Sequence, residues 1–314
     1  MDNYNEVLDQ LQVHGLLVDS LVVGKLTRCK IVDKRERCGW YMLHDMRLDN
    51  GGSLIVGSYG IWQGNDNGAI KVTLDKHEIS NEQKAAIKKR TAEDRKRAEF
   101  ARKKQAAMAA KRADSAWRAG TNEGDLDYLD KKNIQNYGGR FTEKGALMIP
   151  MLDASGQIHG LQFILDSQKH KERIKKTGRN KEYWPGGLIK KGRFHLIGSP
   201  RDVLLIAEGY ATAASLHAAT NLPVAVAFDA NNILPVAEAL KSRYSKTKLI
   251  ICADDDAFSR CTSCKKPINV NDGATCKHCN ESHGKKNTGV SVASLAAMQL
   301  GCEWLAPKFS DEAA

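Results

Sequence analysis

The chain has 314 residues, of which 42% are hydrophobic and 27% charged, and its formal net charge at pH 7 is +11. These proportions are those of globular proteins, so they exclude a wholly disordered chain, and the length predicts about two domains. The apolar runs are far shorter than the roughly 20 residues of a membrane-spanning helix, so no membrane partner is expected. The N-terminus lacks the pattern of a signal peptide, which predicts a cytoplasmic protein.

The positive charge is concentrated in two segments of the chain. Residues 84–118 carry a net charge of +9, residues 166–193 carry +7, and the remainder is slightly acidic. Two basic segments on a mildly acidic body indicate a polyanionic partner such as nucleic acid. The alternative is that both segments are ordinary solvated surface.

The first basic segment predicts one long helix. Residues 82–119 are rich in Ala, Lys, Arg, Glu and Gln and contain neither Pro nor Gly, while Ser80 and Gln83 have the spacing of a capping box. A mostly polar helix either bridges domains or lies on a charged partner. We therefore expect a β-rich or α/β module over residues 1–79 and a long basic helical linker over 80–120.

The region 121–199 is predicted to be β-rich and basic, with strands at 147–152, 158–165 and 194–197. Its second half combines cations with aromatic side chains, as in proteins that stack bases while tracking phosphates. The candidate nucleic-acid-binding residues are Lys181, Tyr183, Trp184, Lys190, Lys191 and Arg193. The alternative for the two aromatic residues is packing inside the protein.

The region 200–314 alternates apolar strands with helices. Strands are predicted at 203–206, 224–228, 249–252 and 303–306, and helices at 210–220, 232–244 and 288–300. Continuous apolar strands separated by helices predict a buried parallel sheet with right-handed crossovers.

Acidic residues follow three of these strands directly. Glu208 follows the first strand, Asp229 the second, and Asp254, Asp255 and Asp256 the third. The carboxyl ends of parallel strands share one edge, where ligands bind in open α/β sheets. Clustered carboxylates repel one another unless a cation lies between them, so we expect Mg²⁺ (or Mn²⁺) at this edge, where Asp254 and Asp256, two residues apart, could both reach one ion.

Four of the eight cysteines form a C-x₂-C-x₁₁-C-x₂-C pattern between the third strand and the last helix. They are Cys261, Cys264, Cys276 and Cys279. Two such knuckles supply the four thiolates of a tetrahedral structural Zn²⁺ site. We therefore predict a zinc ribbon inserted over residues 257–286.

These motifs resemble a known family. Segments 206–213 (IAEGYATA), 227–230 (AFDA), 253–256 (ADDD) and 287–289 (NTG) resemble the Toprim domain, in the version found in phage and plasmid DNA primases. Segments 39–44 (GWYMLH), 161–164 (LQFI) and 185–187 (PGG) are also similar to that group. The expected fold is thus a parallel-sheet α/β Toprim domain with an inserted zinc ribbon, preceded by the β-rich module and the basic helix.

The resemblance implies synthesis of short RNA primers from ribonucleoside triphosphates on single-stranded DNA in a bacterial cell. Glu208 would be the general acid/base or metal residue, and Asp254 with Asp256 the metal-binding D-x-D pair. The sequence has no G-x-x-x-x-G-K-[ST] loop, so a separate helicase is the expected partner. Two alternatives stay open: a Toprim-type metal-dependent nuclease, and a non-catalytic zinc-ribbon DNA-binding accessory protein.

Overall fold

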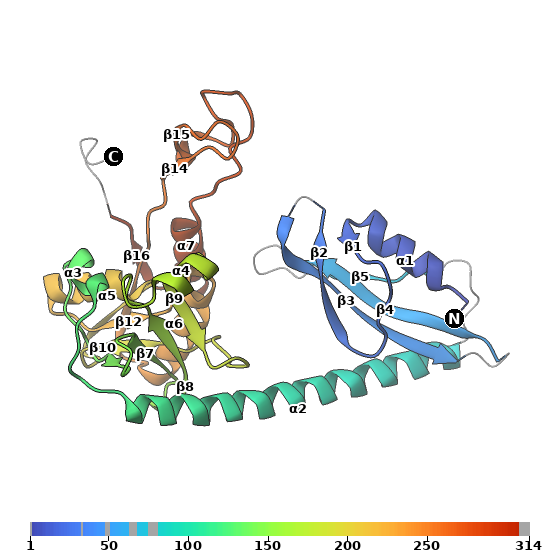
Figure 1. The fold of residues 1–314 in the computed structure, drawn as a ribbon, viewed down its shortest axis with the longest axis horizontal. Coiled ribbons are helices and arrows are strands. Elements are labelled where there is room, and N and C mark those ends of the chain that lie inside the picture. The colour runs from blue at the N-terminus through green and yellow to red at the C-terminus, as the bar shows by residue number, and fades with distance from the viewer. Residues whose placement is uncertain (1, 33, 48–50, 63–67, 75–80, 308–314) are drawn as a thin grey trace. The chain divides into compact units, whose positions relative to one another are not determined.

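The computed structural model describes residues 2–32, 34–47, 51–62, 68–74 and 81–307 (Figure 1). The chain divides into two compact units, Met1–Ala101 and Arg102–Ala314. The predicted capping residue Ser80 lies outside the described residues. Within the described part of the chain, every helix is too short or too polar to cross a membrane.

The first unit is built on a five-stranded antiparallel sheet. The strands follow chain order: β1 (Leu16–Leu17), β2 (Leu26–Ile31), β3 (Lys34–Arg47), β4 (Ser53–Ile61) and β5 (Ile70–Lys71). Helix α1 (Tyr4–Val13) buries Val7 and Leu11 in a cluster with side chains of the sheet. The Asn3 side chain joins this end of α1 to β4, since it donates to the Ile55 carbonyl at 2.9 Å and accepts from the Ile55 N–H at 2.7 Å.

Helix α2 (Asn81–Ala119) begins in the first unit and ends in the second. Its large apolar side chains Phe100 and Met108 are 72% and 60% exposed, so they form no core stripe. The helix instead packs through small residues, because Ala113 is fully buried against Met148 and Leu161. The predicted helix is therefore mostly polar, but alanines give its C-terminal half a packed face.

The second unit continues with short helix α3 (Asp127–Lys132) and a four-stranded antiparallel sheet. This sheet has the order β6 (Arg140–Phe141), β7 (Leu147–Leu152), β8 (Ile158–Ile164) and β9 (Lys181–Trp184), with helix α4 (Lys171–Thr177) between β8 and β9. Strand β7 is almost wholly buried, which explains its continuous apolar sequence.

The C-terminal sheet has the strand order β10-β12-β11-β13-β16. Strands β11 (Val203–Ala207), β12 (Val224–Val226), β13 (Lys248–Cys252) and β16 (Glu303–Leu305) are parallel, which confirms the predicted parallel sheet. Helices α5 (Tyr210–Thr220), α6 (Ile233–Arg243) and α7 (Thr288–Leu300) connect these strands.

One edge of the C-terminal sheet differs from the sequence expectation. The sequence groups strand β10 (His195–Ile197) with the strands of 121–199, but β10 pairs antiparallel with β12. Its buried side chains His195 and Ile197 reach the core of this sheet, and the pairing satisfies backbone groups that would otherwise be buried without partners. The sheet is therefore parallel with one antiparallel edge strand.

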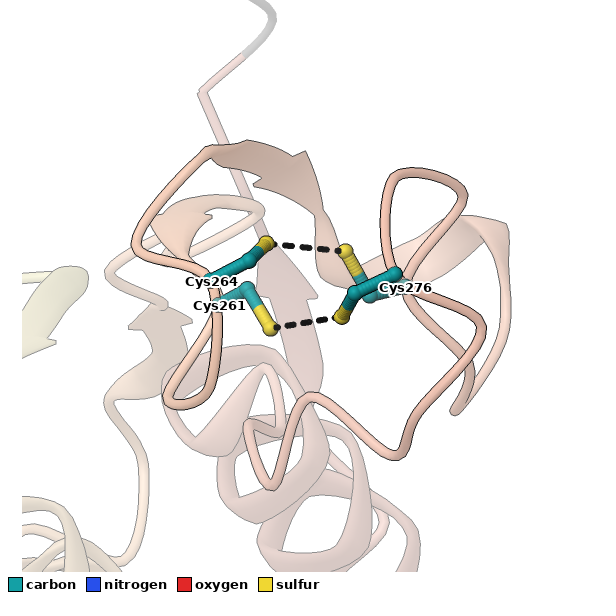
Figure 2. A group of neighbouring side chains, drawn as sticks. Cys261, Cys264 and Cys276 are labelled. Atoms are coloured by element: carbon teal, nitrogen blue, oxygen red, sulfur yellow. Dashed lines mark hydrogen bonds between the residues drawn. The ribbon is translucent and has the colours of Figure 1, made fainter.

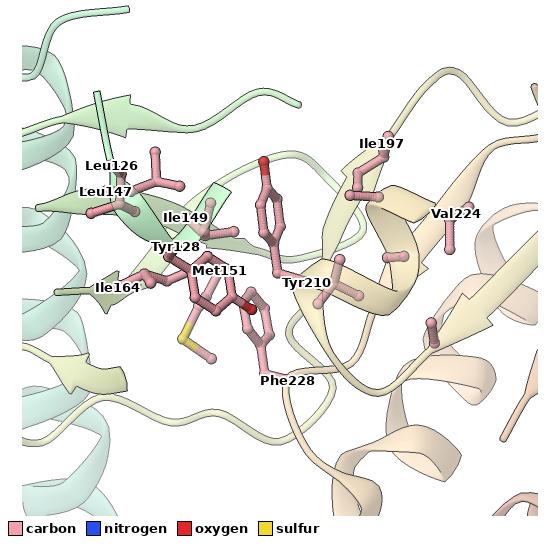
Figure 3. Close-up of a cluster of buried hydrophobic side chains, with 14 of the residues drawn as sticks. Leu126, Tyr128, Leu147, Ile149, Met151, Ile164, Ile197, Tyr210, Val224 and Phe228 are labelled. Carbon is pink, nitrogen blue, oxygen red and sulfur yellow. The ribbon is translucent and has the colours of Figure 1, made fainter. Parts of the chain in front are cut away.

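One hydrophobic cluster spans the two sheets of the second unit (Figure 3). Leu147, Ile149 and Ile164 of the four-stranded sheet belong to one buried cluster with Tyr210 and Phe228 of the C-terminal region. The Tyr210 hydroxyl also accepts from the Tyr137 N–H at 2.7 Å. The region 121–199 thus packs directly on the region 200–314.

Candidate active site

Three acidic residues meet at the carboxyl ends of the parallel strands. In the sheet register Ala207 lies beside Val226 on β12 and beside Cys252 on β13. Glu208 follows Ala207 directly, while Asp229 and Asp254 come a few residues after the neighbouring strands end. Strand pairing alone therefore brings Glu208, Asp229 and Asp254 to one side of the sheet, which we call the carboxylate edge.

The carboxylates at this edge influence one another electrostatically. Burial raises the pKa of Glu208, and the negative charges of Asp254 and Asp256 raise it further. Burial also raises the pKa of Asp254, with Asp256 adding to the effect and the Lys181 ammonium opposing it. Asp254 is half-buried and Asp256 is exposed. The predicted acids thus share one electrostatic site, although they differ in exposure.

Residues from α5 and α7 hold the segment that carries the aspartates. The Thr212 hydroxyl donates to Asp254 Oδ1 at 3.4 Å, and the Asn287 side chain donates to Asp255 Oδ1 at 2.6 Å. Asn287 Oδ1 also accepts from the Asp256 N–H at 3.3 Å. Asp255 is therefore turned toward the start of α7. The sequence alone assigns no role to Thr212 or Asn287, whose only signal is their place in the Toprim-like motifs.

Helix α7 approaches the aspartate segment so closely that only glycine fits at one position. A Cβ atom built on Gly289 would lie 2.1 Å from the Asp254 carbonyl oxygen. Real Cβ atoms do not come so close to backbone, so glycine permits the contact. The N-T-G motif at 287–289 thus has a structural reason: Asn287 bonds to the loop and Gly289 lets the helix reach it.

Part of the second basic segment faces the carboxylate edge. Lys190 forms an ion pair with Asp229, and its ammonium lies 4.6 Å from the centre of the Tyr183 ring. The Tyr183 hydroxyl donates to the Phe228 carbonyl at 2.8 Å, just before Asp229. Lys181 lowers the pKa of both Glu208 and Asp254, which places its charge near them.

The remaining candidate nucleic-acid-binding residues lie elsewhere. The Trp184 ring packs edge-on against Phe163 at 5.8 Å between centroids and has the Arg112 guanidinium 5.1 Å from its centre. Neighbours along a strand point to opposite faces, so Tyr183 is 41% exposed while Trp184 packs toward α2. Lys191 is exposed, and Arg193 is half-buried beside a pocket under α2.

The donor chemistry of the carboxylate edge suits a divalent cation, although the carboxylate oxygens of Glu208, Asp254 and Asp256 do not all lie within 4.8 Å of one another as the sulfur atoms of the four cysteines do. Carboxylate oxygens are ligands that Mg²⁺ and Mn²⁺ prefer, and burial together with the negative charge of neighbouring aspartates raises the pKa of both Glu208 and Asp254. Asp229 already has a cationic partner in Lys190, which makes it the weaker candidate ligand. Glu208, Asp254 and Asp256 are therefore the residues that could hold the ion.

The four cysteines of the insertion come together as the sequence predicts (Figure 2). All four Sγ atoms lie within 4.8 Å of one another; the Cys261–Cys279 separation is 3.8 Å and the Cys264–Cys276 separation is 3.7 Å. Four thiolates bound at about 2.3 Å around a tetrahedral Zn²⁺ would lie roughly 3.8 Å apart. The cluster therefore has the size of a zinc site.

The two cysteine knuckles have matching backbone geometry. In the first, the Lys265 N–H donates to the Cys261 carbonyl at 3.1 Å; in the second, the Asn280 N–H donates to the Cys276 carbonyl at 2.9 Å. Lys265 and Asn280 both adopt the left-handed conformation, with φ of 62° and 57°. The Cys264 and Ser263 N–H groups point at Cys261 and lower the pKa of its thiol, which favours the thiolate that binds metal.

The insertion is anchored at the carboxylate edge. It begins after Asp256 with strand β14 (Phe258–Arg260), which pairs antiparallel with β15 (Pro267–Asn269), and it returns to α7 at Asn287. The Val270 N–H donates to the Ala257 carbonyl at 2.8 Å, which closes its base. The four cysteines are thus tied to the segment that carries the aspartates.

Comparison with known proteins agrees with this description. A family model described as the Toprim domain matches residues 203–273. One curated "DNA primase TraC" of Escherichia coli is 32% identical over 136 residues, covering 41% of this chain and 12% of that protein. Another of the same name and organism is 29% identical over 190 residues, covering 58% of this chain and 11% of that protein. The chain therefore spans about a tenth of the length of these relatives.

A solved structure is also similar. It is titled "Structure of the DnaG primase catalytic domain bound to ssDNA" and matches with a TM-score of 0.33 and 12% identity over 48% of this chain and 62% of that chain. The match to the family model and the curated relatives confirm the resemblance predicted from the motifs: the chain contains a Toprim domain and is similar to plasmid-type DNA primases.

Proposed function

We propose that this protein is a DNA primase that synthesises short RNA primers from ribonucleoside triphosphates on single-stranded DNA. The observation that carries the proposal is the carboxylate edge, where Glu208 and Asp254 share one electrostatic site with the cations Lys181 and Lys190. Nucleotidyl transfer needs both carboxylates and cationic side chains at one site, because a triphosphate must be bound and its negative charge neutralised.

The residues at the edge have separate tasks in this proposal. Glu208, Asp254 and Asp256 hold Mg²⁺ or Mn²⁺, which when bound supplies charge neutralisation and orientation of the triphosphate. Glu208 has a raised pKa, which suits a carboxylate that takes and releases a proton during the reaction. Lys190 holds the Asp229 carboxylate, and the partly exposed Tyr183 ring offers a stacking surface for a base.

The rest of the chain supplies template binding in this proposal. Lys181, Lys190 and Lys191 track the phosphates of single-stranded DNA beside the edge. The cysteine insertion, carrying Zn²⁺ on Cys261, Cys264, Cys276 and Cys279, overhangs the edge and reads the template. A separate helicase opens the duplex, and the reaction takes place in the bacterial cytoplasm.

Product analysis separates this proposal from the two alternatives. The full chain is incubated with single-stranded DNA, Mg²⁺ or Mn²⁺, and labelled ribonucleotides, and the products are sized. New short RNA supports the primase. Shortened DNA would make the protein a Toprim-type nuclease, and DNA binding without any product would make it an accessory protein.

The proposed template-binding residues are tested by charge reversal in matched pairs. Lys181→Glu with Lys190→Glu should weaken binding to single-stranded DNA more than Lys103→Glu with Lys104→Glu, because the first pair lies beside the carboxylate edge. The magnitude of the slope of log K against log salt should fall by roughly 0.7 for each phosphate of the single strand that the variant no longer neutralises. The opposite ranking would make helix α2 the main template track.

A further inference from the structure

A pocket of about 900 Å³ lies away from the carboxylate edge, between the C-terminal half of α2 and the turn that joins β7 to β8. Residues of α2 from Lys103 to Arg118 form one wall, and residues 156–159 form another, with Arg140 and Arg193 completing the lining. Neither Glu208 nor Asp254 is among the described residues that line it. The proposed catalytic site leaves this pocket without a role.

The lining is strongly cationic. Five of its residues carry positive charge, against the one carboxylate of Asp114; the five are Lys103, Lys111, Arg118, Arg140 and Arg193. Asp114 is paired with Arg118 at 2.9 Å, and the carboxylate of Asp153, which is not part of the lining, acts electrostatically on Arg193. A cavity with this excess of positive charge attracts an anion.

One cation in the pocket has an unsatisfied donor. The Nε atom of Arg193 is buried and has no hydrogen-bond partner among the described residues. A buried N–H without a partner is costly, and an oxygen of a bound anion would satisfy it once the Arg193 side chain turns toward the pocket. Guanidinium groups also recognise phosphate through paired hydrogen bonds, so phosphate is the anion that this pocket fits best.

The rest of the pocket is preorganised and partly apolar. The Arg140 guanidinium lies 4.9 Å from the centre of the Trp117 ring and donates to the Trp117 carbonyl at 3.1 Å, which fixes both groups. The Asp153 side chain accepts from the Ser155 and Gln157 N–H groups at 2.9 and 3.1 Å and so holds the opposite turn. Ala106, Ala110 and Ile158 add apolar surface.

We propose that this pocket is a second binding site, for the triphosphate group of a nucleotide, and that it works without a divalent cation. Its volume lies in the range of pockets that enclose one small ligand. Its cations would bind the phosphates while its apolar surface covers the ribose and base. A free nucleotide and the 5′ end of an RNA are both sources of the triphosphate, since they present the same group.

Binding measured without metal tests the pocket separately from catalysis. A fluorescent ATP analogue is titrated into the zinc-loaded full chain in a buffer free of Mg²⁺, Mn²⁺ and chelator, so that the carboxylate edge has no divalent cation to bind. We expect one saturable site. Glu208→Gln should leave this affinity unchanged, so the pocket can be confirmed even where no primer is made. Absence of saturable binding, or its loss in Glu208→Gln, would overturn the proposal.

Matched variants locate the site. Arg193→Gln should lower the affinity at least about tenfold, the loss expected for one charge-assisted hydrogen bond. Lys111→Glu should also weaken binding, while Lys104→Glu, a charge reversal at another exposed position of α2 outside the pocket, should not. Because Lys111 is exposed, that variant reports on binding even where Arg193→Gln folds poorly. Equal effects of Lys111→Glu and Lys104→Glu would contradict the proposal.

Competition identifies the source of the triphosphate. Displacement of the probe by ATP but not by a 5′-triphosphorylated RNA dinucleotide assigns the site to free nucleotides, and displacement by both extends it to RNA ends. A 5′-hydroxyl single-stranded DNA that competes as well as ATP would overturn the proposal, because the cations would then serve a strand rather than a triphosphate.

Discussion

The cysteine cluster and the carboxylate edge are both candidate metal sites, and they are built in opposite ways. The cluster takes its four ligands from residues 261–279, and each knuckle forms its own turn through hydrogen bonds between near neighbours. The edge takes Glu208 and Asp254 from different strands, and their proximity depends on the pairing of β11 with β13.

The difference teaches where each site is vulnerable. A site made of local turns depends on its metal, because so small an insertion has little core of its own. A site made by strand pairing depends on the buried sheet and on helix α7, which share an apolar core of their own. Loss of zinc should therefore damage structure locally, whereas loss of a carboxylate should damage chemistry and leave the structure intact.

The largest expected structural effect comes from breaking the cysteine cluster. The purified protein should carry one zinc per chain, and Cys264→Ser should lose it and unfold residues 257–286, because zinc binding supplies about 10 kcal/mol or more in such units. Elemental analysis and hydrogen exchange measure this, and the C-terminal sheet should stay protected. Cys302→Ser, a thiol outside the cluster, is the control and should keep its zinc. Iron in place of zinc, or no metal, would contradict the site.

Removing a carboxylate tests the other half of the comparison. Glu208→Gln should lower primer synthesis about a thousandfold or more, because metal-assisted charge stabilisation contributes several kcal/mol. In a buffer free of Mg²⁺, Mn²⁺ and chelator, the same variant should melt a few degrees higher than the parent, since a buried charge repelled by Asp254 and Asp256 is removed. Glu123→Gln, an exposed acid, is the matched control. Full activity in Glu208→Gln would remove this residue from the mechanism.

The contact between α7 and the aspartate segment is tested by adding one methyl group. Gly289→Ala should push the segment aside, because its Cβ would lie 2.1 Å from the Asp254 carbonyl oxygen. We expect a fall in activity of about tenfold or more with unchanged zinc content, since overpacking costs about 1–3 kcal/mol. Gly186→Ala, whose Cβ would enter open space, should behave like the parent. Equal activity in the two variants would show that the edge tolerates movement of this loop.

The smallest effect at neutral pH concerns the core that supports the edge. Burial lowers the pKa of His195 to about 4, whereas an unfolded histidine titrates near 6.5. The unfolded chain therefore binds more protons between these pH values, so this residue makes stability fall as pH drops from about 6.5 to 4, by up to about 3 kcal/mol. His195→Gln, which can still donate to the Tyr137 carbonyl, should flatten that part of the pH–stability curve in urea unfolding experiments. An unchanged slope would mean that His195 is not the titrating group.

Local sequence patterns were sufficient for several features. The apolar runs before Glu208 and Asp254 predicted β11 and β13, because a strand buried on both faces must be continuously apolar. The C-x₂-C spacing of Cys261 and Cys264, which the second pair repeats, predicted that the two pairs lie together, because two such knuckles supply the four ligands of one zinc ion. Each of these features is formed by residues close together in the sequence, so the local pattern is enough to predict it.

Other features were decided only by tertiary structure. Strand β10 joined the C-terminal sheet, although its sequence does not specify which strand it pairs with. Tyr183 faces the carboxylate edge, while the adjacent Trp184 packs beside Arg112. The two side chains point to opposite faces of β9, and only tertiary packing determines which of these faces lies against α2. The role of Gly289 and the pocket beside Arg193 likewise arise where distant segments touch. The physical reason is common to all four: long-range packing depends on the shapes of surfaces that no single segment contains.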